Sequence, residues 1–162
     1  MNLNHNLTNN MKELKQYITE KLVLKRNIEV KEYNYHPKTK DELKKLVEQL
    51  IEERGNNADL NDIDVSEITN MSSLFNYSDF NGDISEWDVS NVRDMYHMFS
   101  NSEFNGDISN WDVSKVKNFR SMFEFSKFNQ DISKWKINKN ANLSCMCSDC
   151  PIKDEYIPKV PE

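Results

Sequence analysis

Carboxylates that recur every 24 positions are the residues of this sequence best suited to chemistry. They form two rows, Asp83, Asp107 and Asp131, and Asp64, Asp88 and Asp112, the second ending at Lys136. If the repeats stack at strand spacing, neighbours in a row lie about 5 Å apart, and such rows could bind Ca²⁺ or a basic partner. The alternative is that each Asp accepts backbone N–H groups in its own turn. We favour that role for the single side chains and take the six Asp as the candidate partner-binding residues.

Three cysteines lie close together near the end of the chain, at Cys145, Cys147 and Cys150. With Asp149 or a histidine they could form a zinc site. Cys147, however, occupies the repeat position held by Phe123, and no second pair of cysteines follows, so we predict buried small side chains and no metal. An odd, clustered set is not a disulfide framework, which fits a reducing compartment.

No arrangement of residues in the sequence predicts catalysis. The histidines, His5, His36 and His97, are scattered, and none lies in a motif with a serine or cysteine nucleophile. No glycine-rich loop that could hold a phosphate is present. We therefore predict no enzyme, no catalytic residues and no cofactor.

The elements that must position the carboxylates come from a 24-residue repeat. The phrase F-N-G-D-I-S-E-W-D-V-S at 80–90 returns at 104–114 and, altered, at 128–138. Phasing gives about four units, near 63–86, 87–110, 111–134 and 135–150, within a repeat region of 59–150. A fixed period of this size is typical of a solenoid, in which each unit buries its apolar face against its neighbours.

Two apolar periods alternate within each unit. Ile84, Trp87 and Val89 favour a short strand, whereas the i, i+3, i+4 spacing that includes Met95 and Met98 favours a two-turn helix. Ser90 or Asn91 could cap that helix. We therefore predict an α/β solenoid of strand-turn-helix units.

The recurring large side chains are the predicted core. This set comprises Trp87, Trp111, Trp135, Phe80, Phe104, Phe128, Met95, Met98 and Met122. A tryptophan column could instead form an exposed aromatic strip for a glycan, but we favour packing between layers. The recurring Asn81, Asn105 and Asn129 are predicted to form an asparagine ladder that satisfies buried backbone groups.

The residues before the repeat predict an N-terminal α+β cap at 11–58 after a disordered stretch at 1–10. A helix is indicated from Met11 to about Leu22, with strands at 22–24 and 28–33. A second helix at 40–54 is better specified: Thr39 and Glu42 can form a capping box, and Gly55 can end the helix. An extended tail is expected at 151–162.

Charge and hydropathy restrict the classes of partner. The formal charge is −6. Residues 1–54 hold eleven Lys/Arg and nine Asp/Glu (+2), which leaves ten basic and eighteen acidic residues (−8) for the rest. An acidic repeat region repels phosphate, so nucleic acid is not an expected partner. No segment reads as a signal peptide or membrane span, and we expect a cytoplasmic protein.

The repeat phrase, continued as V-x-x-M-x-x-M-F and an F-N-G-D turn, resembles the repeat of BspA-like bacterial surface proteins. The match covers roughly 59–149. The resemblance implies a leucine-rich-repeat-like array of a kind common in mycoplasmas, treponemes and gut bacteria, often in exported adhesins and also in phage and mobile-element genes. This chain lacks the signal peptide and the lipobox cysteine of the exported kind.

We therefore predict a non-catalytic protein-binding module. Its acidic repeat face would bind a partner with a basic surface, as an intracellular inhibitor or adaptor from a phage or mobile element, in which case it would act in the host cytosol. The alternative is a surface adhesin or glycan-binding protein. We expect a monomer or a weak end-to-end dimer.

Overall fold

The computed structural model describes residues 14–18 and 31–161, and the chain divides into two compact units, Met1–Glu32 and Tyr33–Glu162. In the first unit, residues 14–18 are helical. The other predictions for the start of the chain, namely disorder at 1–10, the rest of the first helix and the two strands, fall mostly outside the described residues. Residues 31–33 are described and contain no strand.

The second unit begins with helix α2, Lys40–Arg54, whose ends follow from local hydrogen bonding. Oγ1 of Thr39 accepts the N–H of Glu42 at 3.2 Å, and the Glu42 carboxylate accepts the N–H of Lys38 at 2.7 Å. The first bond satisfies a donor of the first turn, and the second holds the residue before the N-cap against the helix. At the other end, Gly55 has a φ of 87° and donates its N–H to a carbonyl of the last turn at 2.8 Å. The positive φ ends the helix.

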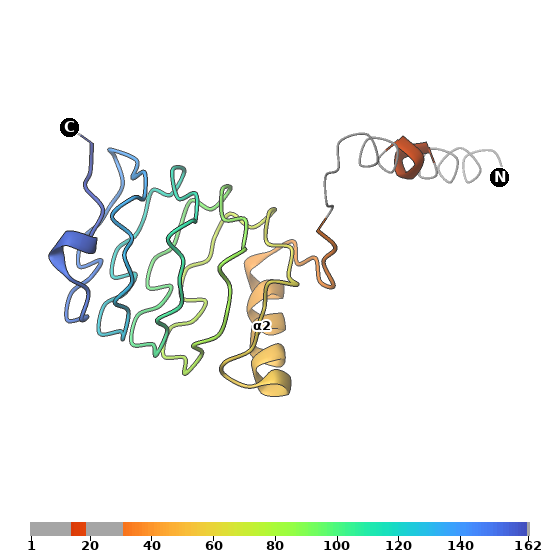
Figure 1. Cartoon of the computed structure of the whole chain (residues 1–162), viewed down its shortest axis with the longest axis horizontal. Coiled ribbons are helices and arrows are strands. Elements are labelled where there is room, and N and C mark those ends of the chain that lie inside the picture. The colour runs from red at the N-terminus through yellow and green to blue at the C-terminus, as the bar shows by residue number, and fades with distance from the viewer. Residues whose placement is uncertain (1–13, 19–30, 162) are drawn as a thin grey trace. The chain divides into compact units, whose positions relative to one another are not determined.

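Helix α2 covers one end of the structure that follows (Figure 1). Its buried side chains, Leu43, Val47 and Leu50, belong to the same hydrophobic core as the repeats. Nζ of Lys40 also donates to Oγ of Ser72 in the first repeat at 2.6 Å. A helix in this place shields the apolar face that the first repeat would otherwise expose.

From residue 56 onward the backbone winds into stacked coils of 24 residues (Figure 1). We name the four coils by the residue at the tryptophan position: the Ile63 coil (56–79), the Trp87 coil (80–103), the Trp111 coil (104–127) and the Trp135 coil (128–150). Single parallel bridges join equivalent positions of successive coils: Asp59–Asp83, Asn70–Asp94, Asp94–Asn118 and Asn118–Asn142. Each bridge is isolated, and residues 14–18 and 31–161 contain no strand.

Two consecutive β-turns occupy the part of each coil where a helix was predicted. In the Trp111 coil, the N–H of Met122 donates to the carbonyl of Phe119 at 3.0 Å, and that of Ser126 to Phe123 at 3.1 Å. The third residue of each turn has a positive φ, as a type II turn requires. These residues are Ser73, Tyr77, His97, Asn101, Ser121, Phe125, Cys145 and Asp149, with φ between 52° and 57°. None is glycine.

Hydrogen bonds between coils hold the paired turns in register. Four alternate residues of the first coil donate to the second: Met71 to Asp94, Ser73 to Tyr96, Phe75 to Met98 and Tyr77 to Ser100, at 2.8–3.0 Å. The same four bonds recur at the next two junctions, at 2.8–3.1 Å. All of them run from an N–H of one coil to a carbonyl of the following coil.

The predicted α/β solenoid of strand-turn-helix units, and with it the leucine-rich-repeat-like array, is therefore wrong. Met95, Met98 and Phe99 have the i, i+3, i+4 spacing of a helix face. Consecutive four-residue turns give the same spacing, because the first and fourth residue of each turn point inward. The predicted strand bends as well, since the N–H of Trp87 donates to the carbonyl of Ile84 at 3.2 Å.

The glycines of the recurring N-G-D sequence allow the coils to approach closely. A Cβ on Gly82 would overlap the carbonyl oxygen of Ala58 in the preceding coil. A Cβ on Gly106 would lie 2.8 Å from ring atoms of Phe104 and 3.2 Å from the Gly82 carbonyl oxygen. At Gly82 the glycine is thus required by packing between backbones rather than by a positive φ.

The C-terminal residues cover the other end of the stack, where an extended tail was predicted. Ile152 is buried, and a short 3-10 helix, η1, spans Asp154–Tyr156. The N–H of Ile132 donates to the carbonyl of Tyr156 at 3.1 Å, which ties this segment to the Trp135 coil. No helix in the described ranges is long and apolar enough to cross a membrane.

Candidate functional site

The predicted carboxylate rows lie on one face of the stack, and each Asp accepts a backbone N–H two residues further on. In the first row, Oδ1 of Asp83, Asp107 and Asp131 each accepts from a serine N–H at 2.9 Å. In the second row, Asp64, Asp88 and Asp112 do the same at 3.0–3.1 Å. These hydrogen bonds form Asx turns, which fix the direction of each side chain. This is the role within its own turn that the sequence analysis favoured for each single Asp.

A third column of Asx turns was not predicted from the sequence. Asn70, Asp94, Asn118 and Asn142 each accept a backbone N–H two residues on, at 2.8–3.2 Å. The signal was available, because Asn or Asp recurs there with the 24-residue period. The predicted helix over this segment concealed it. This column also shows that an asparagine can replace aspartate in such a turn.

The carboxylates of the later coils are held in their ionised form. Hydrogen bonds from the N–H and hydroxyl of Ser109 lower the pKa of Asp107. The pKa values of Asp112 and Asp131 are lowered for the same reason by the serine two residues on. Because each of these side chains is exposed, the rows present negative charge to the solvent at neutral pH.

Asp64 differs from the other members of its row because N-terminal residues cover it. Oδ2 of Asp64 lies 3.2 Å from Nδ1 of His36, and the side chain is 22% exposed. Burial raises the pKa of Asp64, but hydrogen bonds from Ser66 and His36 outweigh it, so the net shift is downward. This carboxylate therefore stabilises the fold, and we define the carboxylate face as Asp83, Asp88, Asp107, Asp112 and Asp131.

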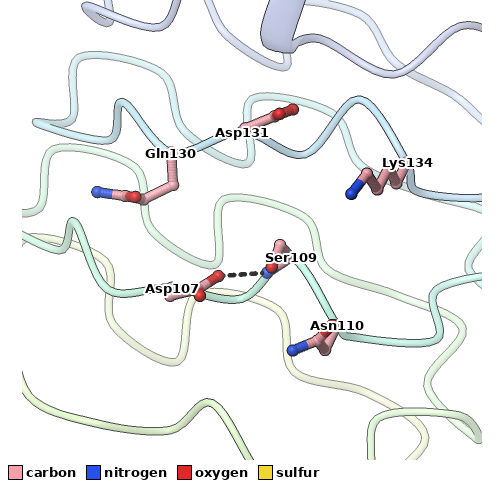
Figure 2. A pocket seen from close by; sticks show the side chains of 6 residues that line it. All are labelled: Asp107, Ser109, Asn110, Gln130, Asp131 and Lys134. Atoms are coloured by element: carbon pink, nitrogen blue, oxygen red, sulfur yellow. Dashed lines mark hydrogen bonds between the residues drawn. The ribbon is translucent and has the colours of Figure 1, made fainter.

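Three hollows follow one another along the carboxylate face. The one in Figure 2 has a volume of about 220 Å³ and is lined by Asp107, Ser109, Asn110, Gln130, Asp131 and Lys134. A second, of about 460 Å³, shares Asp107 and Asn110 and extends to Asp83. A third, of about 410 Å³, contains Asp112 and is bordered by Lys134 and Lys136. The first and third lie side by side between the same two coils and the second lies one coil junction earlier, so together they form a groove over the carboxylate face.

The charge of this groove changes along the stack. The residue three positions after each Asp of the first row lies between the two rows. It is Glu86 in the Trp87 coil, Asn110 in the Trp111 coil and Lys134 in the Trp135 coil. The second row likewise passes from Asp112 to Lys136. Figure 2 shows Lys134 and Asp131 on one coil above Asn110 and Asp107 on the coil before it. The groove is acidic over the middle coils and basic at its C-terminal end.

The tryptophans and the other large repeated side chains lie in the core. Trp87, Trp111 and Trp135 are 3–4% exposed, and each indole N–H donates to a carbonyl of the preceding coil, at 2.9–3.2 Å. Phe80, Phe104, Phe128, Met95, Met98 and Met122 are fully buried. The tryptophan column therefore offers no strip on which a sugar could stack, whereas Tyr77 and Phe125 are exposed.

The predicted asparagine ladder is present along the edge of the groove. Oδ1 of Asn81 accepts the N–H of Asn105, and Oδ1 of Asn105 accepts the N–H of Asn129, both at 2.8 Å. Oδ1 of Asn129 is buried and has no hydrogen-bond partner within the described part of the chain. Within the described residues, the ladder therefore ends at Asn129.

The three cysteines lie near the C-terminal end of the stack. Cys145 is exposed, whereas Cys147 and Cys150 are half-buried against the core, and all three are free thiols. Among residues 14–18 and 31–161, no group of three or more His, Cys, Asp and Glu side chains is placed to hold a metal ion.

Comparison with known proteins identifies a family but no function. A family model described as "Mycoplasma protein of unknown function, DUF285" matches residues 42–159. No curated protein and no solved structure matches the chain. The matched range begins within α2 and includes all four coils and η1.

Proposed function

The chain belongs to the DUF285 family of Mycoplasma proteins of unknown function, and we propose that it is a non-catalytic protein-binding module. The support for this proposal comes from the surface of the chain itself. In this proposal the carboxylate face binds a basic segment of a partner protein. We also propose that the repeat is related to those of BspA-like proteins, on the strength of the shared D-I-S-x-W-D-V-S phrase, and that the protein acts in the cytoplasm.

The observation that carries the proposal is the groove lined by carboxylates in fixed directions. A carboxylate offers about four acceptor sites, so an Asx turn at Asp107 or Asp112 leaves capacity for an arginine or lysine of a partner. Because the turns already hold the side chains, little rotamer entropy is lost on binding. Exposed charges of one sign also attract an oppositely charged partner before contact.

The change from acidic to basic residues along the groove favours one direction for a bound segment of a partner. A basic segment matches the middle coils, where Asp83, Asp88, Asp107 and Asp112 lie. At the C-terminal end, Lys134 and Lys136 would repel further positive charge and favour an acidic residue. We therefore propose one preferred direction, with the acidic end of the partner's segment over the Trp135 coil.

The alternative role in adhesion or glycan binding has less support. The tryptophan column, which was the strip considered for a glycan, is buried. An end-to-end dimer is also disfavoured in this proposal, because α2 covers one end of the stack and Ile152 and Tyr156 cover the other.

The test replaces Asp83, Asp88, Asp107 and Asp112 together by Asn. Asparagine keeps the Oδ1 acceptor of each Asx turn, as Asn70 and Asn118 show, and removes the charge. Proteins captured from a host lysate by the natural chain and by the variant are compared by mass spectrometry, and the captured protein is then purified for titration against both.

We expect a specific partner whose affinity falls at least tenfold in the variant and also falls as salt is raised. The matched control neutralises four exposed carboxylates outside the groove, Glu48, Glu52, Glu103 and Glu155, and should bind like the natural chain. Equal affinity of the natural chain and the groove variant would contradict the proposal.

A further inference from the structure

The last turn of the Trp135 coil is bracketed by two cysteines where the earlier coils have other residues. The first and fourth residues of this turn are Phe75 and Ser78, Phe99 and Ser102, and Phe123 and Ser126 in the first three coils, and Cys147 and Cys150 in the last. Both ends of the same turn have therefore changed to thiols in one coil.

The Cys150 thiol takes the place of a serine hydroxyl. Oγ of Ser102 and Oγ of Ser126 each donate to the carbonyl three residues earlier at 2.7 Å. Sγ of Cys150 makes the equivalent contact with the carbonyl of Cys147 at 3.2 Å. The Cys150 side chain is thus turned back over its own turn, toward the residue at the other end.

A β-turn of this kind is compatible with a disulfide between its first and fourth residues. Asp149, the third residue, has a φ of 55°, as in the equivalent type II turns of the other coils. The first and fourth Cα atoms of a β-turn lie less than about 7 Å apart, and disulfides join Cα atoms about 4.4–6.8 Å apart. The two thiols are also close enough for each to shift the pKa of the other.

We propose that Cys147 and Cys150 are a redox-active dithiol that closes reversibly to a disulfide by exchange with a low-molecular-weight disulfide such as oxidised glutathione. This site is independent of the carboxylate face. It would make the last coil, and the C-terminal segment that begins at Pro151, responsive to the thiol–disulfide balance around the protein.

The two thiols have different roles in the exchange. The hydrogen bond from Cys147 lowers the pKa of Cys150 to about 7, so that much of it is thiolate at neutral pH, the form that attacks a disulfide. The same hydrogen bond, together with burial, raises the pKa of Cys147. Cys150 is therefore the attacking residue, and Cys147 resolves the intermediate.

The exchange balances in two steps. The Cys150 thiolate attacks one sulfur of oxidised glutathione, which forms a mixed disulfide and releases one glutathione thiolate. Cys147 then transfers its proton to that thiolate or to solvent and attacks the Cys150 sulfur, which forms the protein disulfide and releases the second glutathione. Two protein thiols are oxidised, and one glutathione disulfide is reduced to two thiols.

The test uses the full chain with Cys145→Ser, which removes the exposed third thiol. The protein is equilibrated in buffers of reduced and oxidised glutathione, quenched with acid, alkylated and analysed by intact and peptide mass spectrometry. We expect a species that has lost two hydrogens and takes up no alkylating agent, with Cys147 joined to Cys150, which returns to the dithiol when reduced glutathione is in excess.

Cys150→Ser in the same background is the matched variant, because serine restores the residue of the earlier coils and its hydrogen bond, so the fold should be kept. We expect this variant to accumulate no disulfide and Cys147 to react slowly. In the parent protein, alkylation of Cys150 should rise with pH around a midpoint near 7. Accumulation of glutathione adducts on Cys147 and Cys150 without an internal disulfide, or disulfides only between chains, would overturn the proposal.

Discussion

The guanidinium of Arg54, the last residue of α2, holds the Asp62 carboxylate of the first coil at two points. Nη1 lies 3.1 Å from Oδ1, and Nη2 lies 3.0 Å from Oδ2. Asn34 also donates to Oδ2 at 2.9 Å. The segment before α2, the end of α2 and the first coil therefore meet at one carboxylate, which joins the covering helix to the stack.

Replacement of Asp62 by Asn should lower the free energy of unfolding by about 1 kcal/mol, because a two-point bond to a guanidinium is lost at a partly exposed site. Denaturant unfolding followed by circular dichroism measures this. Glu48→Gln is the control, since its carboxylate contacts Lys44 only at 4.0 Å on the helix surface, and it should change stability by no more than about 0.5 kcal/mol. Equal effects of the two changes would show that the Arg54 contact does not stabilise the fold.

The stability of the fold should fall in acid. Hydrogen bonds from Arg54 lower the pKa of Asp62, and hydrogen bonds from Ser109 and Ser114 lower those of Asp107 and Asp112. The pKa of each of these carboxyls is lower in the folded state than in the unfolded state, where it is about 4. The stability that the ionised carboxylates contribute is therefore fully present above about pH 4 and is lost as the pH falls through their folded-state pKa values. Melting temperatures measured from pH 7 to pH 3 should drop below pH 4, and Asp62→Asn should drop less. A melting temperature unchanged down to pH 3 would contradict this account.

Gly82→Ala should be the more damaging of two equivalent changes. Its new Cβ meets the backbone carbonyl of Ala58, which cannot move without opening the coil junction, whereas at Gly106 the nearest atoms belong to the Phe104 ring. We expect a loss of about 2–3 kcal/mol for Gly82→Ala and about 1 kcal/mol for Gly106→Ala. Urea midpoints of the two variants provide the measurement, and a ranking in the opposite order would refute the packing argument.

Tyr77→Asn should raise stability. Tyr77 is 75% exposed and has a φ of 57°, a conformation that costs most residues about 1 kcal/mol but suits asparagine. Asn101 occupies the equivalent place in the next coil. We expect a gain of up to about 1 kcal/mol in unfolding free energy, and Tyr96→Asn, on a side chain outside the positive-φ positions, serves as the control. A loss of stability in Tyr77→Asn would mean that the exposed ring makes contacts the backbone argument ignores.

Local sequence signals were sufficient to predict the structure where residues close in sequence determine it. Thr39, Glu42 and Gly55 mark the ends of α2, and the Asx turns at Asp107 and Asp112 use the hydrogen bonds that aspartate forms within a few residues. The period of 24 gave the register of the coils, and hence which side chains share a column.

The backbone conformation within each coil was not predictable in this way. Paired turns and a two-turn helix bury the same positions, as Met95, Met98 and Phe99 show. The usual sign of a type II turn is glycine at the third residue, and here Ser121 and Phe125 take that conformation. Hydrogen bonds to the next coil stabilise it, and these depend on residues 23 positions away. The cysteine pair was likewise visible in the sequence, but its meaning depends on the turn that joins it.

The bonds between the paired turns give the stack an electrical polarity. Every one of them directs an N–H toward the following coil. They outnumber the flanking bonds that point the other way, such as Arg93 to Thr69 and Lys117 to Arg93, so the peptide dipoles, each of about 3.5 D, leave a net dipole along the stack. The positive end of this field lies at the coil that contains Cys147 and Cys150, and the negative end faces α2. A thiolate formed at Cys150 would thus lie where the backbone favours negative charge, in a protein whose overall charge is −6.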